Sequence, residues 1–453
     1  MAESTNTIQK EIQDREAKEK RELRRKRRRR NQILAILTLL LFVCLIVAII
    51  GIGVWYIMHR GAGKTAGGGA ATTEETTIDN LFESEDEIVK PEETNTEPAL
   101  TPEQQLDAIL DEAFISQMPL EDKVAGLFIV TPESITGVNK AVKAGDGTKD
   151  ALNKYAVGGI VYASQNMQDA AQFTEMVSNT TLYSRYALFT CVAEEGGSST
   201  SLEKAGLADK TDSEQAMGTG ADAAKAYEVS GKIADSMLTY GLNLNFAPVA
   251  DLATVQDSYL KDASYGSDAA LAASFVTSAV QGMQEKGISS CLKYFPGAAD
   301  MKEDPAKGMA SSERTAEQLA AEEFTVFKAG IDAGVDMVMV GHVAVPALTG
   351  DNTPCSLSSA VITDKLRNEL GFNGVIITDA MNKGAITEYY EADEAAILAL
   401  KAGCDMILCP DDFEKAYNGV LEAVQNGTIS EERINDSLRR IYRIKYAGMM
   451  PEA

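Results

Sequence analysis

The chain has 453 residues, of which 42 are Lys or Arg and 67 are Asp or Glu, so its net charge at pH 7 is −25. Hydrophobic residues make up 45% of it, which excludes a wholly disordered or fibrous protein and allows a sizeable core that needs no disulfide or metal. The sequence has only two histidines, so a multi-histidine metal site or a Ser-His-Asp hydrolase is hard to build.

The N-terminal part joins a basic segment to an apolar one. Residues 1–32 hold 12 Lys or Arg against 6 Asp or Glu, and residues 33–58 contain no charged side chain. At ~1.5 Å per residue, a helix over 33–58 exceeds the ~30 Å hydrocarbon layer. Because basic residues beside a first span stay in the cytoplasm, we predict a basic cytoplasmic tail (1–32), one transmembrane helix (33–58) and the remainder outside the cell membrane.

Two other interpretations of this segment are less favoured. A cleaved signal peptide has a shorter apolar core, and a nucleic-acid patch needs no adjoining apolar span. No nucleic-acid partner is therefore expected. Residues 59–105 follow; they are rich in Gly and Ala and then in Thr, Glu and Pro, which predicts a flexible acidic linker.

From residue 106 to 453 the chain alternates apolar runs with amphipathic segments. Continuous apolar character is typical of strands that are buried on both faces of a parallel sheet. The runs are Val124–Val130, Gly159–Ala163, Ala187–Val192, Leu242–Ala247, Ser289–Tyr294, Val335–Val340, Gly374–Thr378 and Asp405–Cys409. Helices are expected over Ala221–Tyr240, Asp268–Glu285, Thr315–Ala333, Glu391–Ala402 and Thr428–Ala447, with glycine C-caps at Gly241, Gly287, Gly334, Gly371 and Gly403.

Eight strand–helix repeats predict an α/β fold, a closed (β/α)8 barrel of the TIM type. A miscount of one strand would allow a doubly wound open sheet instead. Beyond the span, the five cysteines lie mostly in or beside apolar runs, so buried free thiols are favoured over a zinc site: Cys191, Cys291, Cys355, Cys404 and Cys409.

Polar residues follow the predicted strands, where a barrel of this type carries its chemistry. They include Glu195 after the third strand, Asp251 after the fourth, Lys293 at the fifth, His342 after the sixth and Asp379 after the seventh. Such a set favours an acidic cavity that binds hydroxyl groups, and a sugar is the natural ligand. An Asp at a strand end is also placed to attack an anomeric carbon.

The same residues resemble the N-terminal barrel of glycoside hydrolase family 3, in particular the single-domain β-N-acetylhexosaminidases that process peptidoglycan amino sugars. The similarity runs from about Pro119 to Met449 and is strongest over Leu370–Met381, with further matches at Gly158–Val161, Glu195–Gly197, Asn243–Asp251, Lys293–Gly297 and Gly341–Ser358. The resemblance implies that Asp379 is the catalytic nucleophile. It implies an amino-sugar glycan or peptidoglycan fragment as partner, and no metal or organic cofactor.

The departures from the family pattern cluster at the expected site. Both histidines of the motif after the fifth strand are absent, and Ala306 stands where the resemblance places the acid/base histidine. Asp304 matches the aspartate of that acid/base dyad, and Glu303 beside it is a possible substitute acid. Sugar-binding positions are also replaced, by Ala193, Ser198 and Ala263. Two-domain relatives can supply the acid from a second domain, and we expect none in this chain.

Several site residues keep two interpretations. Lys293 is a sugar ligand or the ion-pair partner of a carboxylate, and His342 is catalytic or only a hydrogen-bonded structural residue. Glu195 is a ligand or part of a tight glycine turn, and Asp251 is a substrate ligand or holds a loop through backbone amides. Asp379 is the nucleophile or a helix cap.

Three functions follow from these alternatives. The first is a surface-anchored hydrolase whose activity on natural glycosides is weak or lost, because general acid help is worth about 10²–10⁴-fold. The second is a non-catalytic pseudoenzyme that binds glycan or organises proteins at the membrane surface. The third gives the basic tail the main role, with an anionic lipid or a protein as its partner.

Overall fold

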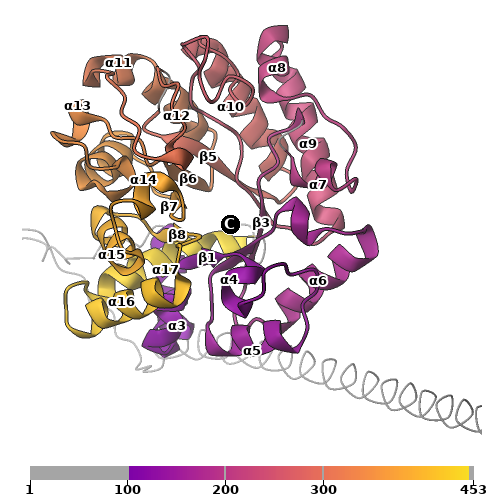
Figure 1. Ribbon diagram of the computed structural model, residues 1–453, viewed down its shortest axis with the longest axis vertical. Coiled ribbons are helices and arrows are strands. Elements are labelled where there is room, and N and C mark those ends of the chain that lie inside the picture. Colours follow the sequence, from indigo (N-terminus) through magenta and orange to yellow (C-terminus); the bar gives the residue numbers. More distant parts are fainter. Residues whose placement is uncertain (1–101, 198–199, 298–299, 448–453) are drawn as a thin grey trace, which may run out of the picture. The chain divides into compact units, whose positions relative to one another are not determined.

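A computed structural model describes residues 102–197, 200–297 and 300–447 of the protein (Figure 1). The predicted basic tail, the predicted transmembrane helix 33–58 and the predicted linker up to residue 101 lie outside these residues. Within the described ranges, no helix has the length and apolar character required to cross a bilayer. The first described helix begins at Pro102, four residues before the predicted start of the barrel.

Eight parallel strands close into a barrel in chain order, and the last strand pairs with the first through Phe128 with Ile407 and Ile129 with Leu408. The strands are β1 (Phe128–Val130), β2 (Gly159–Val161), β3 (Phe189–Val192), β4 (Leu244–Asn245), β5 (Ser289–Phe295), β6 (Met337–Val340), β7 (Val375–Ala380) and β8 (Met406–Leu408). The predicted (β/α)8 barrel is confirmed, and the alternative of an open sheet is excluded by the pairing of β8 with β1.

Helices surround the strands on the outside, as Figure 1 shows. The longer ones are α2 (Pro102–Ala113), α5 (Asp146–Lys154), α6 (Ala170–Tyr183), α9 (Ala223–Thr239), α10 (Ala269–Gln284), α12 (Glu323–Asp332), η6 (Ala360–Glu369, a π-helix), α15 (Ala392–Ala402), α16 (Phe413–Gln425) and α17 (Glu431–Tyr446). The short helices are α3 (Leu120–Ala125), α4 (Pro132–Thr136), α7 (Ser201–Lys204), α8 (Glu214–Gly220), α11 (Ala316–Ala321), α13 (Pro346–Thr349) and α14 (Gly384–Thr387). Single 3₁₀ turns are η1 (Ile115–Gln117), η2 (Ser164–Asn166), η4 (Pro305–Lys307) and η5 (Cys355–Leu357).

The hydrophobic core consists of the strands and the inner faces of these helices. All four residues of β6 are buried, as are all four of β3, which explains why these strands have continuous apolar sequences. The five predicted glycine C-caps all have positive φ, the conformation that glycine adopts without a Cβ clash. The cysteines of the described part are free, and four of the five are buried, as predicted.

Two predicted elements differ from the structure. The run that begins at Val124 was expected to be strand throughout, but its first residues end helix α3 and the strand begins only at Phe128. The helix expected over Thr315–Ala333 is divided into α11 and α12 at Glu322. At this break the Arg314 guanidinium donates to both Glu322 and Glu323, at 2.6 and 2.7 Å, so one buried cation holds the carboxylates on both sides of the turn.

Helix α2 forms ion pairs with α17, the last described helix. The Arg439 guanidinium donates from Nε to both oxygens of Asp111 at 2.8 Å, and Arg443 Nε donates to Asp107 Oδ1 at 2.6 Å. The first and last described helices therefore lie side by side. This arrangement makes α2 part of the barrel domain.

Candidate active site

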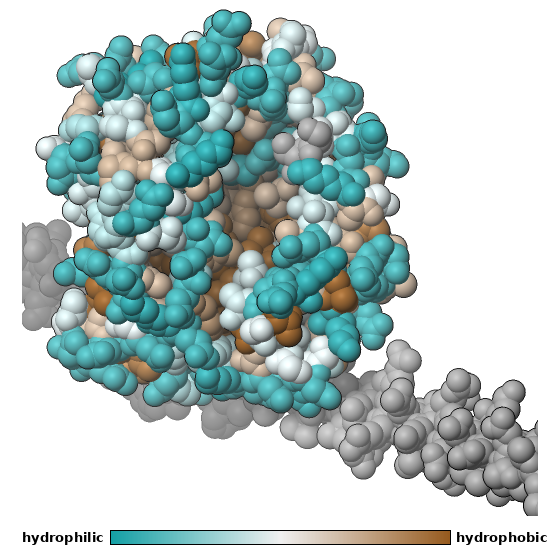
Figure 2. Space-filling model, viewed as in Figure 1, coloured by the Kyte–Doolittle hydropathy of each residue, from teal (hydrophilic) through white to brown (hydrophobic). Residues whose placement is uncertain are grey.

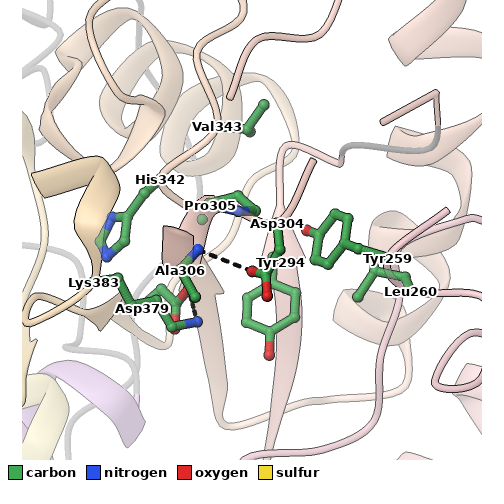
Figure 3. Close-up of a pocket in the computed structure, with 11 residues that line it drawn as sticks. Tyr259, Leu260, Tyr294, Asp304, Pro305, Ala306, His342, Val343, Asp379 and Lys383 are labelled. Atoms are coloured by element: carbon green, nitrogen blue, oxygen red, sulfur yellow. Dashed lines mark hydrogen bonds and ion pairs between the residues drawn. The ribbon is translucent and has the colours of Figure 1, made fainter. Parts of the chain in front are cut away.

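A pocket of about 240 Å³ opens beyond the carboxyl ends of strands β5, β6 and β7. In the view of Figure 3, Tyr259, Tyr294 and Asp304 lie on one side and His342, Asp379 and Lys383 on the other. The remaining lining residues are Leu260, Pro305, Ala306, Gly341 and Val343. The surface seen in Figure 2 is hollowed near its centre, and the floor of this hollow is more apolar than its rim. The pocket brings together three residues that the sequence predicted: Asp304, His342 and Asp379.

Asp379 is the second-to-last residue of β7 and is 6% exposed. Its Oδ1 accepts a hydrogen bond of 2.7 Å from the Ala380 N–H, and its Oδ2 accepts one of 2.7 Å from Lys383 Nζ. Burial by itself raises the pKa of this carboxyl, but the Lys383 ammonium and the Ala380 N–H outweigh it and hold the pKa below its usual value. Asp379 is therefore an ionised carboxylate that faces the pocket.

His342 lines the same pocket but has both ring nitrogens engaged. Nδ1 lies 2.7 Å from Ser356 Oγ, and Nε2 lies 3.0 Å from the carbonyl oxygen of Ala380. Burial lowers the pKa of the imidazole, so the ring is neutral at physiological pH. Its hydrogen bonds support the structural interpretation of this residue: it fixes the chain just after Asp379.

The loop after β5 carries the predicted remnant of the acid/base dyad. Asp304 lines the pocket, and its Oδ1 accepts a hydrogen bond of 2.9 Å from the Ala306 N–H (Figure 3). Glu303 is exposed and is not among the residues that line the pocket. Ala306, which also lines it, contributes no proton donor from its side chain. Of the adjacent carboxyls Glu303 and Asp304, Asp304 is the one placed to meet a ligand.

Glu195 and Lys293 form a buried ion pair beside the pocket lining rather than within it. Gly196 and Gly197 follow Glu195 with positive φ, so the expected tight glycine turn is also present. The structure thus contains the ion pair expected for Lys293 and the turn expected after Glu195, and the ligand roles of both residues stay predictions. Close by, burial raises the pKa of Glu214 well above its usual value.

Tyr294, which follows Lys293 in β5, lines the pocket. Its ring centroid lies 5.5 Å from Lys293 Nζ and 5.4 Å from Lys383 Nζ, within the range of cation–π attraction. Tyr294 therefore connects the buried Lys293–Glu195 pair with the Lys383–Asp379 pair. Burial raises the pKa of its phenol well above 10, so the hydroxyl stays protonated.

Asp251 is 1% exposed and is absent from the residues that line the pocket. Its backbone carbonyl accepts a hydrogen bond of 2.8 Å from Ser264 Oγ, which fixes the long loop after β4. This contact supports the loop-holding role, although through the carbonyl oxygen of Asp251.

Lys383 and Tyr259 are among the lining residues that the sequence did not identify. Lys383 follows Asp379 by four residues, and the short turn between β7 and α14, which no helical spacing predicts, brings its ammonium to the carboxylate. Tyr259 lies in an irregular stretch far from any strand end and carried no sequence signal. Among the described residues, no group of three or more His, Cys, Asp or Glu side chains is arranged to hold a metal ion.

Comparisons with known proteins agree with this geometry. The pattern of the glycosyl hydrolase family 3 N-terminal domain matches residues 119–444, which contain all eight strands and the whole pocket. The chain belongs to glycosyl hydrolase family 3. The resemblance predicted from the strand-end motifs is thus confirmed at the level of the family.

Some of the similar proteins are named β-hexosaminidases or β-N-acetylglucosaminidases. A β-hexosaminidase of Stenotrophomonas maltophilia is 30% identical over 284 residues, covering 60% of this chain and 82% of the relative. A family 3 β-N-acetylglucosaminidase from Paenibacillus sp. FPU-7 superposes with a TM-score of 0.69 at 32% identity, covering 74% of this chain and 64% of the other. A family 3 member from Mycobacterium smegmatis gives a TM-score of 0.65 at 26% identity and is covered over 98% of its length.

Proposed function

We propose that the pocket binds the amino sugar of a glycan and that Asp379 attacks its anomeric carbon, but that turnover of ordinary glycosides is slow. The observation that carries this proposal is the state of the pocket's ionisable groups. Asp379 is an ionised carboxylate, whereas His342 is neutral and engaged through both nitrogens. The described lining residues thus supply a nucleophile, and the position that the resemblance gives to the acid/base histidine is filled by Ala306.

A site with a nucleophile but without the acid/base histidine should favour some leaving groups over others. Attack by an Asp379 oxygen on the anomeric carbon forms a glycosyl–enzyme ester and expels the leaving-group oxygen, which needs a proton unless it is already a weak base. General acid catalysis contributes about 10²–10⁴-fold to such steps. We therefore expect activated aryl glycosides to react and plain disaccharides to react slowly.

The leaving-group dependence of the rate tests this proposal. We would compare kcat/KM for dinitrophenyl, nitrophenyl and methylphenyl β-glycosides of an amino sugar, both N-acetylated and as the free amine. The expected result is a steep rise in rate with the acidity of the phenol, and Asp379→Asn should abolish the reaction of the dinitrophenyl substrate. Rapid cleavage of an unactivated disaccharide would contradict the loss of acid catalysis.

Two adjacent carboxyls of the loop after β5, Glu303 and Asp304, are the candidates for a general acid that replaces the missing histidine. We propose that, of the two, Asp304 can assist a leaving group because it lines the pocket, whereas Glu303 is exposed. Asp304→Asn should lower the rate with the methylphenyl substrate more than with the dinitrophenyl one, and Glu303→Gln should change neither. A loss in Glu303→Gln that is confined to the methylphenyl substrate would assign the acid to Glu303.

The Asp379–Lys383 ion pair favours a second candidate function, non-catalytic glycan binding. A carboxylate that is neutralised by an ammonium at 2.7 Å is a weaker nucleophile than a free one. In this case, no aryl glycoside reacts, and the saturable binding of cell-wall fragments survives Asp379→Asn. Organisation of protein partners at the membrane surface is the related alternative, to be tested by copurification of proteins with the wild type and the same variant.

We also propose that the barrel is displayed outside the cell membrane on a single N-terminal helix. This rests on the uncharged residues 33–58 and the basic residues before them. Protease added to intact cells should digest the barrel, and removal of residues 33–58 should release it from the membrane fraction. Deletion of residues 1–30 tests whether the tail acts through a lipid or protein partner: an altered phenotype with a folded barrel would support that role.

A further inference from the structure

The pocket lining holds more acidic than basic side chains. The lining has two carboxyl side chains, Asp304 and Asp379, and one lysine, Lys383, and burial lowers the pKa of His342. The buried Lys293–Glu195 pair behind Tyr294 cancels itself. Because Lys383 Nζ donates its hydrogen bond to Asp379, Asp304 is the carboxyl of the lining that this lysine does not pair with.

Two tyrosine side chains, Tyr259 and Tyr294, lie beside these carboxyls in the lining. Burial raises the pKa of Tyr294 and of Tyr259, and nearby carboxylates raise both further. For each phenol the carboxylates involved include Asp251, Asp304 and Asp379. The pocket therefore attracts cations and disfavours anions. It also offers aromatic rings, and Tyr294 already attracts two ammonium groups at 5.4 and 5.5 Å.

We infer that this pocket selects a sugar with a free, protonated amine (a glucosamine-type unit) over its N-acetylated counterpart. The inference rests on the proposed glycan-binding function and names its substrate class. An ammonium group can donate a charge-assisted hydrogen bond to the Asp304 carboxylate and lie against a tyrosine ring, whereas an acetamide is neutral and bulkier. The pocket volume of about 240 Å³ leaves little room beyond a single sugar ring.

Three β-1,4-linked trimers that differ only at carbon 2 provide the test: the glucosamine trimer, the N-acetylglucosamine trimer and the glucose trimer. Binding to the full-length chain in non-ionic detergent would be measured by calorimetry at about pH 6, where amines are protonated and carboxylates are ionised. We expect the glucosamine trimer to bind at least about tenfold more tightly than either neutral trimer, and this preference to shrink at high salt.

A pair of charge-matched variants separates contact in the pocket from overall charge. Asp304→Asn should reduce the preference for the amine several-fold. Asp257→Asn removes an equal charge from the same side of the barrel, but its side chain is 74% exposed and outside the lining, so the preference should persist. An unchanged preference in Asp304→Asn would overturn the assignment to Asp304.

The outcomes distinguish this inference from the proposed function. If the N-acetylated trimer binds as tightly as the amine or more tightly, the amine preference is wrong and glycan binding stands. If none of the three trimers binds to a folded protein, the proposed glycan-binding function fails and the inference fails with it. If the amine preference is equal in wild type, Asp304→Asn and Asp257→Asn, general charge attraction replaces specific recognition.

Discussion

Two buried aspartates at opposite ends of neighbouring strands differ in what surrounds them. Asp405 precedes β8 and is 0% exposed, whereas Asp379 lies near the carboxyl end of β7 and faces the pocket. Burial raises the pKa of each, and cationic neighbours then lower it below the usual value. The two residues thus share a type and an ionisation state but not an environment.

The partners show the difference. Asp405 accepts hydrogen bonds from four groups: Arg367 Nη2 at 2.8 Å, Arg440 Nη1 at 3.0 Å, Ser437 Oγ at 2.9 Å and the Ile376 N–H at 2.9 Å. Asp379 accepts one from a lysine and one from an amide. A carboxylate enclosed by donors serves the stability of the barrel, and one that keeps an open side can meet a substrate, which matches the division between the two ends of such barrels.

Asp405→Asn should have the largest effect on the free energy of unfolding. It leaves the guanidinium groups of Arg367 and Arg440 without their shared anion and places an amide N–H₂ against donors. Because breaking a buried pair costs about 3–5 kcal/mol and these arginines are partly exposed, we expect a loss near 3 kcal/mol in urea denaturation. The exposed pair Lys328–Asp332 is the control, and Asp332→Asn should cost less than about 0.5 kcal/mol. Equal losses of unfolding free energy in Asp405→Asn and Asp332→Asn would contradict a stabilising role of the buried Asp405 cluster.

Glu194 is a third buried carboxyl, and it differs from Asp379 and Asp405 because its hydrogen-bond donors are backbone N–H groups and not cations. Its Oε1 accepts from the Ser201 and Leu202 N–H groups at 2.7 and 3.0 Å, and burial raises its pKa to about 7. The folded state then binds a proton that the unfolded state releases, so stability falls as pH rises from about 4.5 to 7 and is constant above. The total change approaches about 3 kcal/mol.

Glu194→Gln keeps an acceptor for both N–H groups but cannot ionise. It should remove this pH slope, as measured by thermal unfolding between about pH 4.5 and 7.5. Asp209→Asn, a change at an exposed carboxyl of the neighbouring loop, should leave the slope intact. If the pH dependence of stability persists in Glu194→Gln, another titrating group causes it.

The sequence was most informative where a residue acts through its own strand or helix. Continuous apolar runs identified all eight strands, and positive-φ glycines ended the predicted helices, because both signals are local. The start of β1 was misplaced because Val124 and Ala125 are buried in helix α3 rather than in a strand, and apolar runs do not distinguish the two. The division at Glu322 was missed since it depends on Arg314, which is bonded to both carboxylates.

The site shows the same limit. Asp379 and Asp304 were found because motifs surround them, and His342 because it follows a strand. Tyr259 reaches the pocket only through the folding of a long loop, which no sequence period reports. The pKa of Asp379 likewise depends on Lys383. The sequence identified Asp379 as a site residue but did not identify the lysine that lowers its pKa.

Asp379→Asn should barely change stability, in contrast to Asp405→Asn. The Lys383 side chain that it leaves is 26% exposed and can turn towards water, so the free energy of unfolding should change by less than about 1 kcal/mol. The reaction of activated aryl glycosides should nevertheless be lost. A destabilisation near that of Asp405→Asn would show that Asp379 serves the fold, and the nucleophile role would then lack support from the comparison.

Lys383→Met should have the smallest effect on stability, and its consequence should appear in the pH dependence of the reaction. Without the ammonium, burial becomes the dominant influence on Asp379 and its pKa rises. Attack requires the carboxylate, so the acidic limb of kcat/KM for a dinitrophenyl glycoside should move to higher pH, and Lys383→Arg, which keeps a cation, should restore it. If the acidic limb does not move in Lys383→Met, a group other than Lys383 keeps Asp379 ionised. Asp379 would then resemble Asp405, whose ionised form is stabilised by several donors.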